Sequence, residues 1–179
     1  MFGKSRIPES GLGWNRQAIP QVRLRVVVES LMQTNYRILS DGSSVAVISD
    51  DCLEAEQGAV EFEGTLYDIR RRGWWRKEYF LAGDDACAIA RQTGSFFRTE
   101  FTLEFERSRY TLNDRSFFNN NLLLRQNGHV LGYMENTGIF LSETIAVLPI
   151  DIPVPVQVFI IWLGLVSWDL GGSDGGGGA

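Results

Sequence analysis

The chain has 179 residues, of which 44% are apolar and 22% are charged, so it is long enough for one globular domain with a hydrophobic core. Its net charge of -5 argues against a general nucleic-acid-binding function, which requires a basic surface. The first residues contain no apolar run of the kind found in signal peptides. We therefore expect a cytoplasmic protein, either free or peripherally attached to a membrane.

Residues 1–20 mix Gly, Pro, Ser and charged side chains, which predicts a flexible N-terminal arm ahead of a folded domain at 21–170. Within the domain, several segments alternate apolar and polar residues, the pattern of strands with one buried face. The clearest such segments are residues 22–29, 60–67 and 97–106. In the second of them we expect Val60, Phe62, Gly64 and Leu66 to share the buried face.

A strand–turn–strand pattern recurs at residues 36–48, 79–90 and 122–133. The three expected turns contain Asp41–Gly42, Asp84–Asp85 and Asn127–Gly128. Asp-Gly and Asn-Gly adopt the positive φ angles that two-residue hairpin turns require. The pattern therefore predicts three hairpins in a meandering antiparallel sheet. Whether it is also a true internal repeat stays open, because any all-β chain contains such turns.

Residues 154–168 predict a helix that is apolar on every side, interrupted only by Gln157 and Ser167. Such a helix has to be covered on all sides, by protein or by lipid. The segment is short for a bilayer, and its flanks are acidic rather than basic. We therefore expect a mainly β fold, a closed antiparallel barrel of about 12 strands around this central C-terminal helix. A membrane-spanning helix is the alternative.

The ends of the predicted helix carry further signals. Asp151 is the expected N-terminal cap, and Pro153 and Pro155 fall at or before the first turn, where proline is tolerated. Residues 171–179 are rich in glycine and predict a disordered tail.

The segment Leu148-Pro-Ile-Asp-Ile-Pro-Val-Pro-Val-Gln-Val-Phe-Ile-Ile-Trp-Leu resembles small members of the tubby C-terminal-like superfamily, as do Arg-Arg-Gly-Trp-Trp-Arg-Lys-Glu-Tyr-Phe-Leu-Ala and Gly128-His-Val-Leu-Gly-Tyr. This superfamily includes the tubby-like proteins, the phospholipid scramblases and the LURP-one-related proteins. The resemblance covers roughly residues 21 to 170 and implies a twelve-stranded barrel around a central helix. It also implies an anionic phospholipid ligand at the barrel exterior. The scramblase calcium segment has no counterpart, because residues 141–152 contain only Glu143 and Asp151 as acidic residues.

A run of five cations around two tryptophans is the best candidate site: Arg70, Arg71, Arg72, Trp74, Trp75, Arg76 and Lys77. Cations reach lipid phosphates and indole rings favour the headgroup level, so the mixture suits an anionic membrane surface. The alternative is a structural hairpin, in which the arginines are solvated or paired with glutamates and the tryptophans pack against the end of the barrel.

Other reactive residue types form no catalytic or metal-binding pattern. His129, the only histidine, is expected on a surface turn. The acidic groups Asp50, Asp51, Glu54, Glu56 and Asp84, Asp85 are expected in solvated loops. Cys52 and Cys87 lack metal or redox spacing, and we expect buried free thiols rather than a disulfide.

We therefore predict a non-enzymatic binding module without metal or cofactor, whose partner is an anionic membrane surface or another protein. The alternatives are a soluble interaction scaffold with no small ligand and a C-terminally membrane-anchored protein. The oligomeric state cannot be derived from the sequence.

Overall fold

The computed structural model describes residues 19–28, 35–49, 56–73, 76–83, 87–93, 100–116, 119–137 and 143–172, and for 114–116, 119–120 and 169–172 it describes the backbone alone. Most of the expected N-terminal arm and of the expected tail, residues 1–18 and 173–179, lies outside the described residues.

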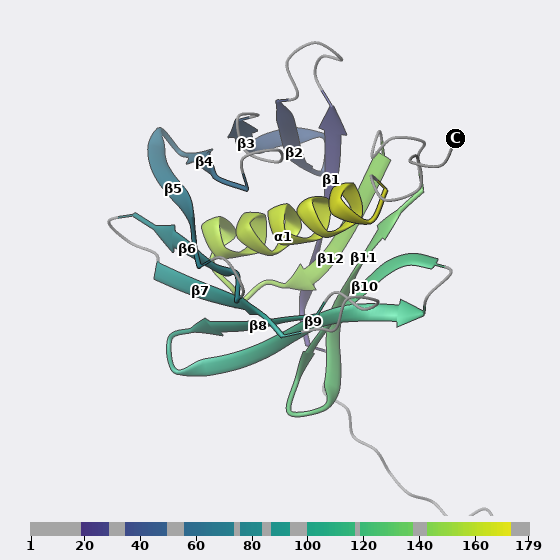
Figure 1. Ribbon diagram of the computed structural model, residues 1–179. Coiled ribbons are helices and arrows are strands. Elements are labelled where there is room, and N and C mark those ends of the chain that lie inside the picture. Colours follow the sequence, from purple (N-terminus) through teal and green to yellow (C-terminus); the bar gives the residue numbers. More distant parts are fainter. Residues whose placement is uncertain are drawn as a thin grey trace, which may run out of the picture.

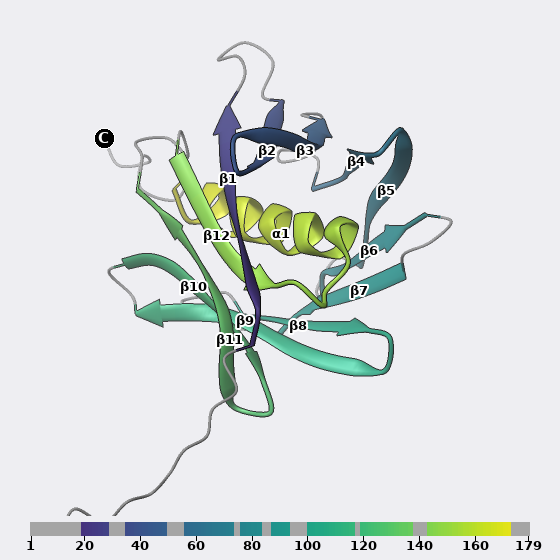
Figure 2. The same cartoon turned by 180° about the vertical axis from the view of Figure 1, so that it is seen from behind.

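The protein is a closed barrel of twelve antiparallel strands around one helix, as predicted from the sequence (Figures 1 and 2). Each strand pairs with the next along the chain, and β1 closes the ring by pairing with β12. The strands are β1 (Gln21–Val28), β2 (Tyr36–Ser40), β3 (Ser43–Ser49), β4 (Gly58–Phe62), β5 (Thr65–Arg72), β6 (Glu78–Ala82), β7 (Cys87–Gln92), β8 (Glu100–Phe105), β9 (Ser108–Ser116), β10 (Asn119–Gln126), β11 (His129–Asn136) and β12 (Glu143–Pro149). The helix is α1 (Val154–Gly172).

Because neighbouring strands run in opposite directions, they finish alternately at the two ends of the barrel. Even-numbered strands from β2 to β10 finish at one end of the barrel, which we call the turn end, at Ser40, Phe62, Ala82, Phe105 and Gln126. Odd-numbered strands finish at the other end, which we call the loop end, at Val28, Ser49, Arg72, Gln92, Ser116 and Asn136. The chain enters at the turn end, and α1 also begins there, because β12 finishes at that end.

The predicted hairpins are present at β2–β3, β6–β7 and β10–β11. Asp41–Gly42 and Asn127–Gly128 form two-residue turns with positive φ at both positions, the geometry that matches the twist of the flanking strands. Asp84 and Asp85 lie outside the described residues.

The expected strand at 60–67 is wrong, because the chain turns at Glu63–Gly64, where both φ angles are positive. Val60 pairs with Tyr67 across this hairpin, so a two-residue turn shifts the alternation by one position. Tyr67 is consequently 3% exposed, whereas Leu66 faces solvent and is 61% exposed.

The helix α1 lies inside the ring of strands, and both views show it crossing the barrel interior (Figures 1 and 2). Every side chain from Pro155 to Ser167 is buried, in agreement with an enclosed apolar helix. We find no helix among the described residues with the length and sustained hydropathy that a membrane crossing requires.

The helix begins at Val154 and runs through Gly172, four residues beyond the predicted end. Asp151 is exposed and lies three residues before the first helical residue. The position before the helix is occupied by Pro153, whose carbonyl oxygen accepts hydrogen bonds from the backbone N–H groups of Val156 and Gln157. Pro153 therefore takes the capping position that the sequence had suggested for Asp151.

Candidate functional site

The basic run of the sequence, residues 70–77, lies at the loop end, on the last residues of β5 and on the 73–77 connection to β6. Gly73 permits the sharp turn of this connection, because its φ is 87° and a Cβ there would overlap the carbonyl oxygen of Arg76. Trp74 and Trp75, which belong to the predicted lipid site, lie outside the described residues.

Strand alternation separates the cations of the run into two groups. Arg70 and Arg72 are exposed on the outer face of β5, while Arg71 follows the buried Tyr67 and Ile69 on the inner face. Arg76 is exposed and Lys77 is half-buried. The run of the sequence is therefore not one continuous cationic surface.

The inward cations converge on Glu56, in what we call the Glu56 cluster: Glu56, Arg71, Lys77 and Tyr79. Arg71 Nη1 lies 2.7 Å from Glu56 Oε2, Lys77 Nζ lies 2.5 Å from Glu56 Oε1, and Tyr79 Oη donates to Oε2 at 3.0 Å. Glu56 is 4% exposed, so its carboxylate exchanges hydration for three direct donors.

The expectation that Glu56 lies in a solvated acidic loop is wrong. Its partners stand 15, 21 and 23 residues further along the chain, so no local pattern could have revealed the cluster. The neighbouring acidic residues Asp50, Asp51 and Glu54 lie outside the described residues.

Tyr79 connects the Glu56 cluster to the barrel core. Its ring meets Phe101 and Trp162 edge-on, with centroid separations of 5.9 Å and 5.4 Å. Burial raises the pKa of the Tyr79 hydroxyl, and the neighbouring Glu56 carboxylate raises it further. Tyr79 therefore stays protonated and remains a hydrogen-bond donor at neutral pH.

The outward cations differ in their partners. Arg70 forms an exposed ion pair with Asp68 at 2.6 Å, and Arg72 lies over the Phe80 ring, 5.4 Å from its centroid. Within the part of the chain that the structure describes, Arg72 and Arg76 have no acidic partner. These two arginines are therefore free to meet an anionic partner outside the barrel.

Further around the exterior, the charges alternate and balance. Arg91 on β7 bridges Glu78 and Glu104 at 2.8 and 2.9 Å, and Arg109 on β9 reaches the same Glu104 at 2.7 Å. Hydrogen bonds from Arg109 and Arg91 lower the pKa of Glu104. This row carries two arginines and two glutamates, so it adds no net charge to the outer surface.

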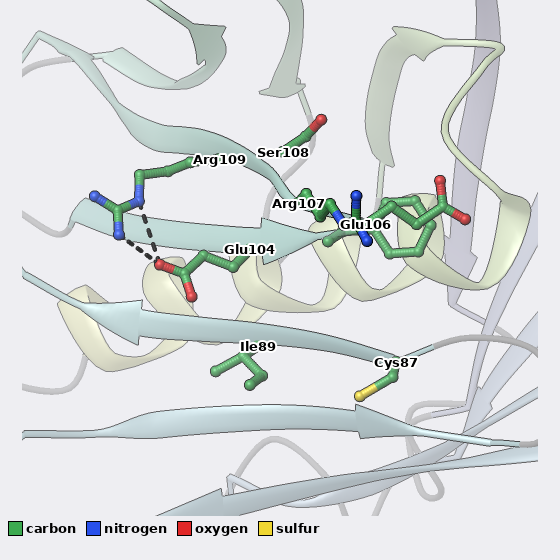
Figure 3. A pocket seen from close by; sticks show the side chains of 8 residues that line it. Cys87, Ile89, Glu104, Glu106, Arg107, Ser108 and Arg109 are labelled. Atoms are coloured by element: carbon green, nitrogen blue, oxygen red, sulfur yellow. Dashed lines mark hydrogen bonds and ion pairs between the residues drawn. The ribbon is translucent and has the colours of Figure 1, made fainter.

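A shallow depression of about 410 Å³ opens beside this row at the turn end (Figure 3). Its lining includes Cys87, Ile89, Phe105, Arg107 and the Glu104–Arg109 pair, which Figure 3 shows with Arg109 directed at Glu104. The expectation of a buried thiol is wrong for Cys87, which is free and exposed at the first position of β7. Cys52 lies outside the described residues.

The remaining candidates provide no second site. His129 is exposed directly after the Asn127–Gly128 turn, as predicted. No group of three or more His, Cys, Asp or Glu residues in the described ranges could hold a metal ion.

No protein-family model, no curated protein and no solved structure matches this chain. The resemblance to the tubby C-terminal-like superfamily therefore stays an expectation, and the site has to be interpreted from its own chemistry.

Proposed function

We propose that the protein is a non-enzymatic binding module that recognises anionic phospholipid through the outward arginines of the loop end, chiefly Arg72 and Arg76 with Arg70 beside them. The observation that carries the proposal is that this cationic connection is held at both of its ends. Arg71 lies on β5 just before the connection and Lys77 is its last residue, and both bind the same buried carboxylate of Glu56.

The anchoring matters because a fixed connection loses less conformational entropy on binding than a free one. Arg72 is additionally held against Phe80. The exposed arginines are thus presented from a defined frame, and the sequence places two tryptophans between Arg72 and Arg76.

The filled interior supports an exterior ligand. The helix side chains from Val156 to Val166 are at most 2% exposed, so α1 occupies the space in which an open barrel would hold a small molecule. Binding at the outer surface is the mode compatible with such a core.

The local charge supports an anionic ligand in spite of the overall net charge of -5. Each basic residue near an anionic membrane contributes about 1 kcal/mol, so two or three arginines give weak, salt-sensitive binding. The proposal therefore predicts reversible peripheral attachment.

Co-sedimentation with vesicles tests the proposal. The full chain is mixed at low salt with phosphatidylcholine vesicles or with vesicles that also contain phosphatidylserine. We expect binding to the anionic vesicles alone, and we expect R72Q/R76Q to weaken it by about 2 kcal/mol, or about thirtyfold.

The matched control is R23Q/R107Q, which removes the same charge from exposed positions toward the turn end. Equal binding to neutral and anionic vesicles, or equal losses in the two double variants, contradicts the proposal.

A protein-interaction scaffold is the second candidate, and exposed apolar side chains at the turn end favour it. Ile19, Val130 and Ile150 are 44%, 51% and 58% exposed and belong to the neighbouring strands β1, β11 and β12 or to their immediate ends. This candidate predicts no vesicle preference and a partner whose binding is weakened by V130S/I150S.

A further inference from the structure

The Glu56 cluster has the donor composition of an oxyanion-binding site. A guanidinium, an ammonium and a phenolic hydroxyl all point at one carboxylate, and each carboxylate oxygen has at least one donor. The same three groups are suited to phosphate oxygens, which accept short charge-assisted hydrogen bonds from Arg and Lys.

The donors and the acceptor come from different kinds of structure. Arg71 and Tyr79 lie on the paired strands β5 and β6, and the Lys77 carbonyl accepts a hydrogen bond from the Gln92 backbone N–H at 3.0 Å. Glu56 instead lies on the connection between β3 and β4, with a φ of 50°, which is uncommon for a residue other than glycine. The donors thus belong to the barrel frame, while the anion is delivered by a connecting segment.

The charges of the cluster do not balance. Two cations face one carboxylate, and their side chains are 27% and 25% exposed against 5% for Glu56. One positive charge is therefore left over in a partly desolvated position, and a dianionic group in place of the Glu56 carboxylate would balance both cations.

We propose that Arg71, Lys77 and Tyr79 form a binding site for a phosphomonoester group, and that the Glu56 carboxylate is the tethered occupant with which this ligand competes. The inference deepens the proposed function by naming the chemical class of headgroup, and in that respect it rests on the proposed function. The outward Arg72 and Arg76 supply general attraction to anionic surfaces, whereas the inward cluster supplies chemical selectivity.

A tethered occupant lowers the apparent affinity of the site for any free ligand. Glu56 competes at the effective concentration of a covalently attached group, on the order of millimolar or higher. Removing the carboxylate should therefore raise the apparent affinity for phosphate by about tenfold or more, because a larger fraction of the molecules then has an unoccupied site.

The test uses the full chain and inorganic phosphate at constant ionic strength, with chloride as the balancing anion. Binding is measured by calorimetry, and the thermal midpoint is followed in parallel. We expect E56A to bind phosphate about tenfold or more tightly than the wild type, and we expect phosphate to raise its midpoint.

Two further variants separate the site from general electrostatics. E61A makes the same change in charge at an exposed position on the outer face of β4, and we expect it to behave as the wild type does. E56A/R71Q should lose the gained affinity. An equal phosphate response in E56A and E61A overturns the inference, as does full retention of binding in E56A/R71Q.

E56Q serves if E56A does not fold. It keeps the side-chain shape and one hydrogen-bond acceptor, but its neutral amide competes less strongly with phosphate, so the same comparison with E61A applies. A phosphate response of E56Q no larger than that of E61A overturns the inference.

Vesicles then identify the source of the phosphate group. Phosphatidate presents a phosphomonoester, whereas phosphatidylserine presents a phosphodiester, and the two are compared at matched surface charge. Preference for phosphatidate that disappears in R71Q supports a lipid source for the ligand.

The two proposals can fail separately. Phosphate binding by E56A without any vesicle binding supports the site, assigns it to a soluble phosphomonoester and contradicts the proposed function. Vesicle binding through Arg72 and Arg76 without a phosphate response in E56A leaves the proposed function standing and overturns this inference.

Discussion

Gln157 provides the sharpest test of how the helix is attached to the barrel. It is 2% exposed in the first turns of α1, and its side-chain Nε2 donates to two backbone carbonyls, at 2.9 Å to Pro149 and at 2.7 Å to Ile152. Both carbonyls belong to the passage from β12 into the helix. One side chain therefore joins the last strand to the enclosed helix.

Replacing Gln157 by methionine keeps an unbranched side chain and removes the donor. The Ile152 carbonyl loses its side-chain donor, a loss of about 1–3 kcal/mol for a buried acceptor. The Pro149 carbonyl still accepts a hydrogen bond from the Ile152 N–H at 3.4 Å. Losing the Gln157 donor there should therefore cost only the net free energy of one hydrogen bond, about 0.5–1.5 kcal/mol. Gln157 Oε1 has no hydrogen-bond partner among the described residues, and removing it returns part of this loss.

The net expectation for Q157M is a free energy of unfolding lower by about 1–3 kcal/mol. Urea unfolding measures it as a lower midpoint at an unchanged denaturant slope. The control is L163M, a volume-conserving change at a fully buried helix position, which should cost less than about 1.5 kcal/mol. If Q157M is as stable as the wild type, Gln157 does not anchor the helix and the reasoning is refuted.

Three further outcomes are expected. G164A overpacks the core, because the added Cβ would lie 2.5 Å from Met134 Cε, and we expect it to lower the free energy of unfolding by about 1 kcal/mol. In a double-mutant cycle, M134A should partly reverse this loss, because it removes the side chain that the new Cβ meets. The raised pKa of Tyr79 means that the native state holds the Tyr79 hydroxyl proton more tightly than the unfolded state does. The contribution of Tyr79 to stability is therefore complete below the pKa of an unfolded tyrosine, near 10, and it falls as the pH rises above that value. Y79F should therefore flatten this alkaline loss, and equal alkaline slopes for the two proteins would contradict the assignment. L66T should change the free energy of unfolding by no more than about 0.5 kcal/mol, since Leu66 faces solvent, and a loss above 2 kcal/mol would place Leu66 in the core instead.

The architecture was largely predictable because it depends on patterns that are local in the sequence. An all-apolar helix has to be enclosed on all sides, and strands with one apolar face have to pack that face against other apolar residues. A closed barrel around the helix satisfies both requirements, so the sequence predicts the two together. The hairpins at Asp41–Gly42 and Asn127–Gly128 were also predictable, since Asp-Gly and Asn-Gly are the dipeptides most favoured in turns with two positive φ angles.

The error at residues 60–67 had a local cause as well. The stretch alternates through Glu63–Gly64 as though the strand continued, although Gly64 was available as a turn signal. A two-residue turn preserves the appearance of period two while exchanging the faces beyond it, and Leu66 and Tyr67 are therefore reversed.

The candidate site was predictable only in part. Composition correctly locates a basic run, but its division between the two faces requires knowing that residues 70–72 are strand. The role of Glu56 could not be found, because its burial depends on a connection packing against side chains from two later strands. The lipid ligand itself stays a prediction.

Ring closure between β1 and β12 has a consequence for how the protein reaches its native state. Gln21 pairs with Pro149, so the seam joins segments from nearly opposite ends of the domain. During synthesis β1 emerges long before β12, its partner at the seam, and the helix that fills the interior emerges later still. Local hairpins can form early, but the apolar inner faces stay open until β12 and α1 have left the ribosome. We expect folding of the domain to be slow, with the unsealed sheet as the species most prone to aggregation.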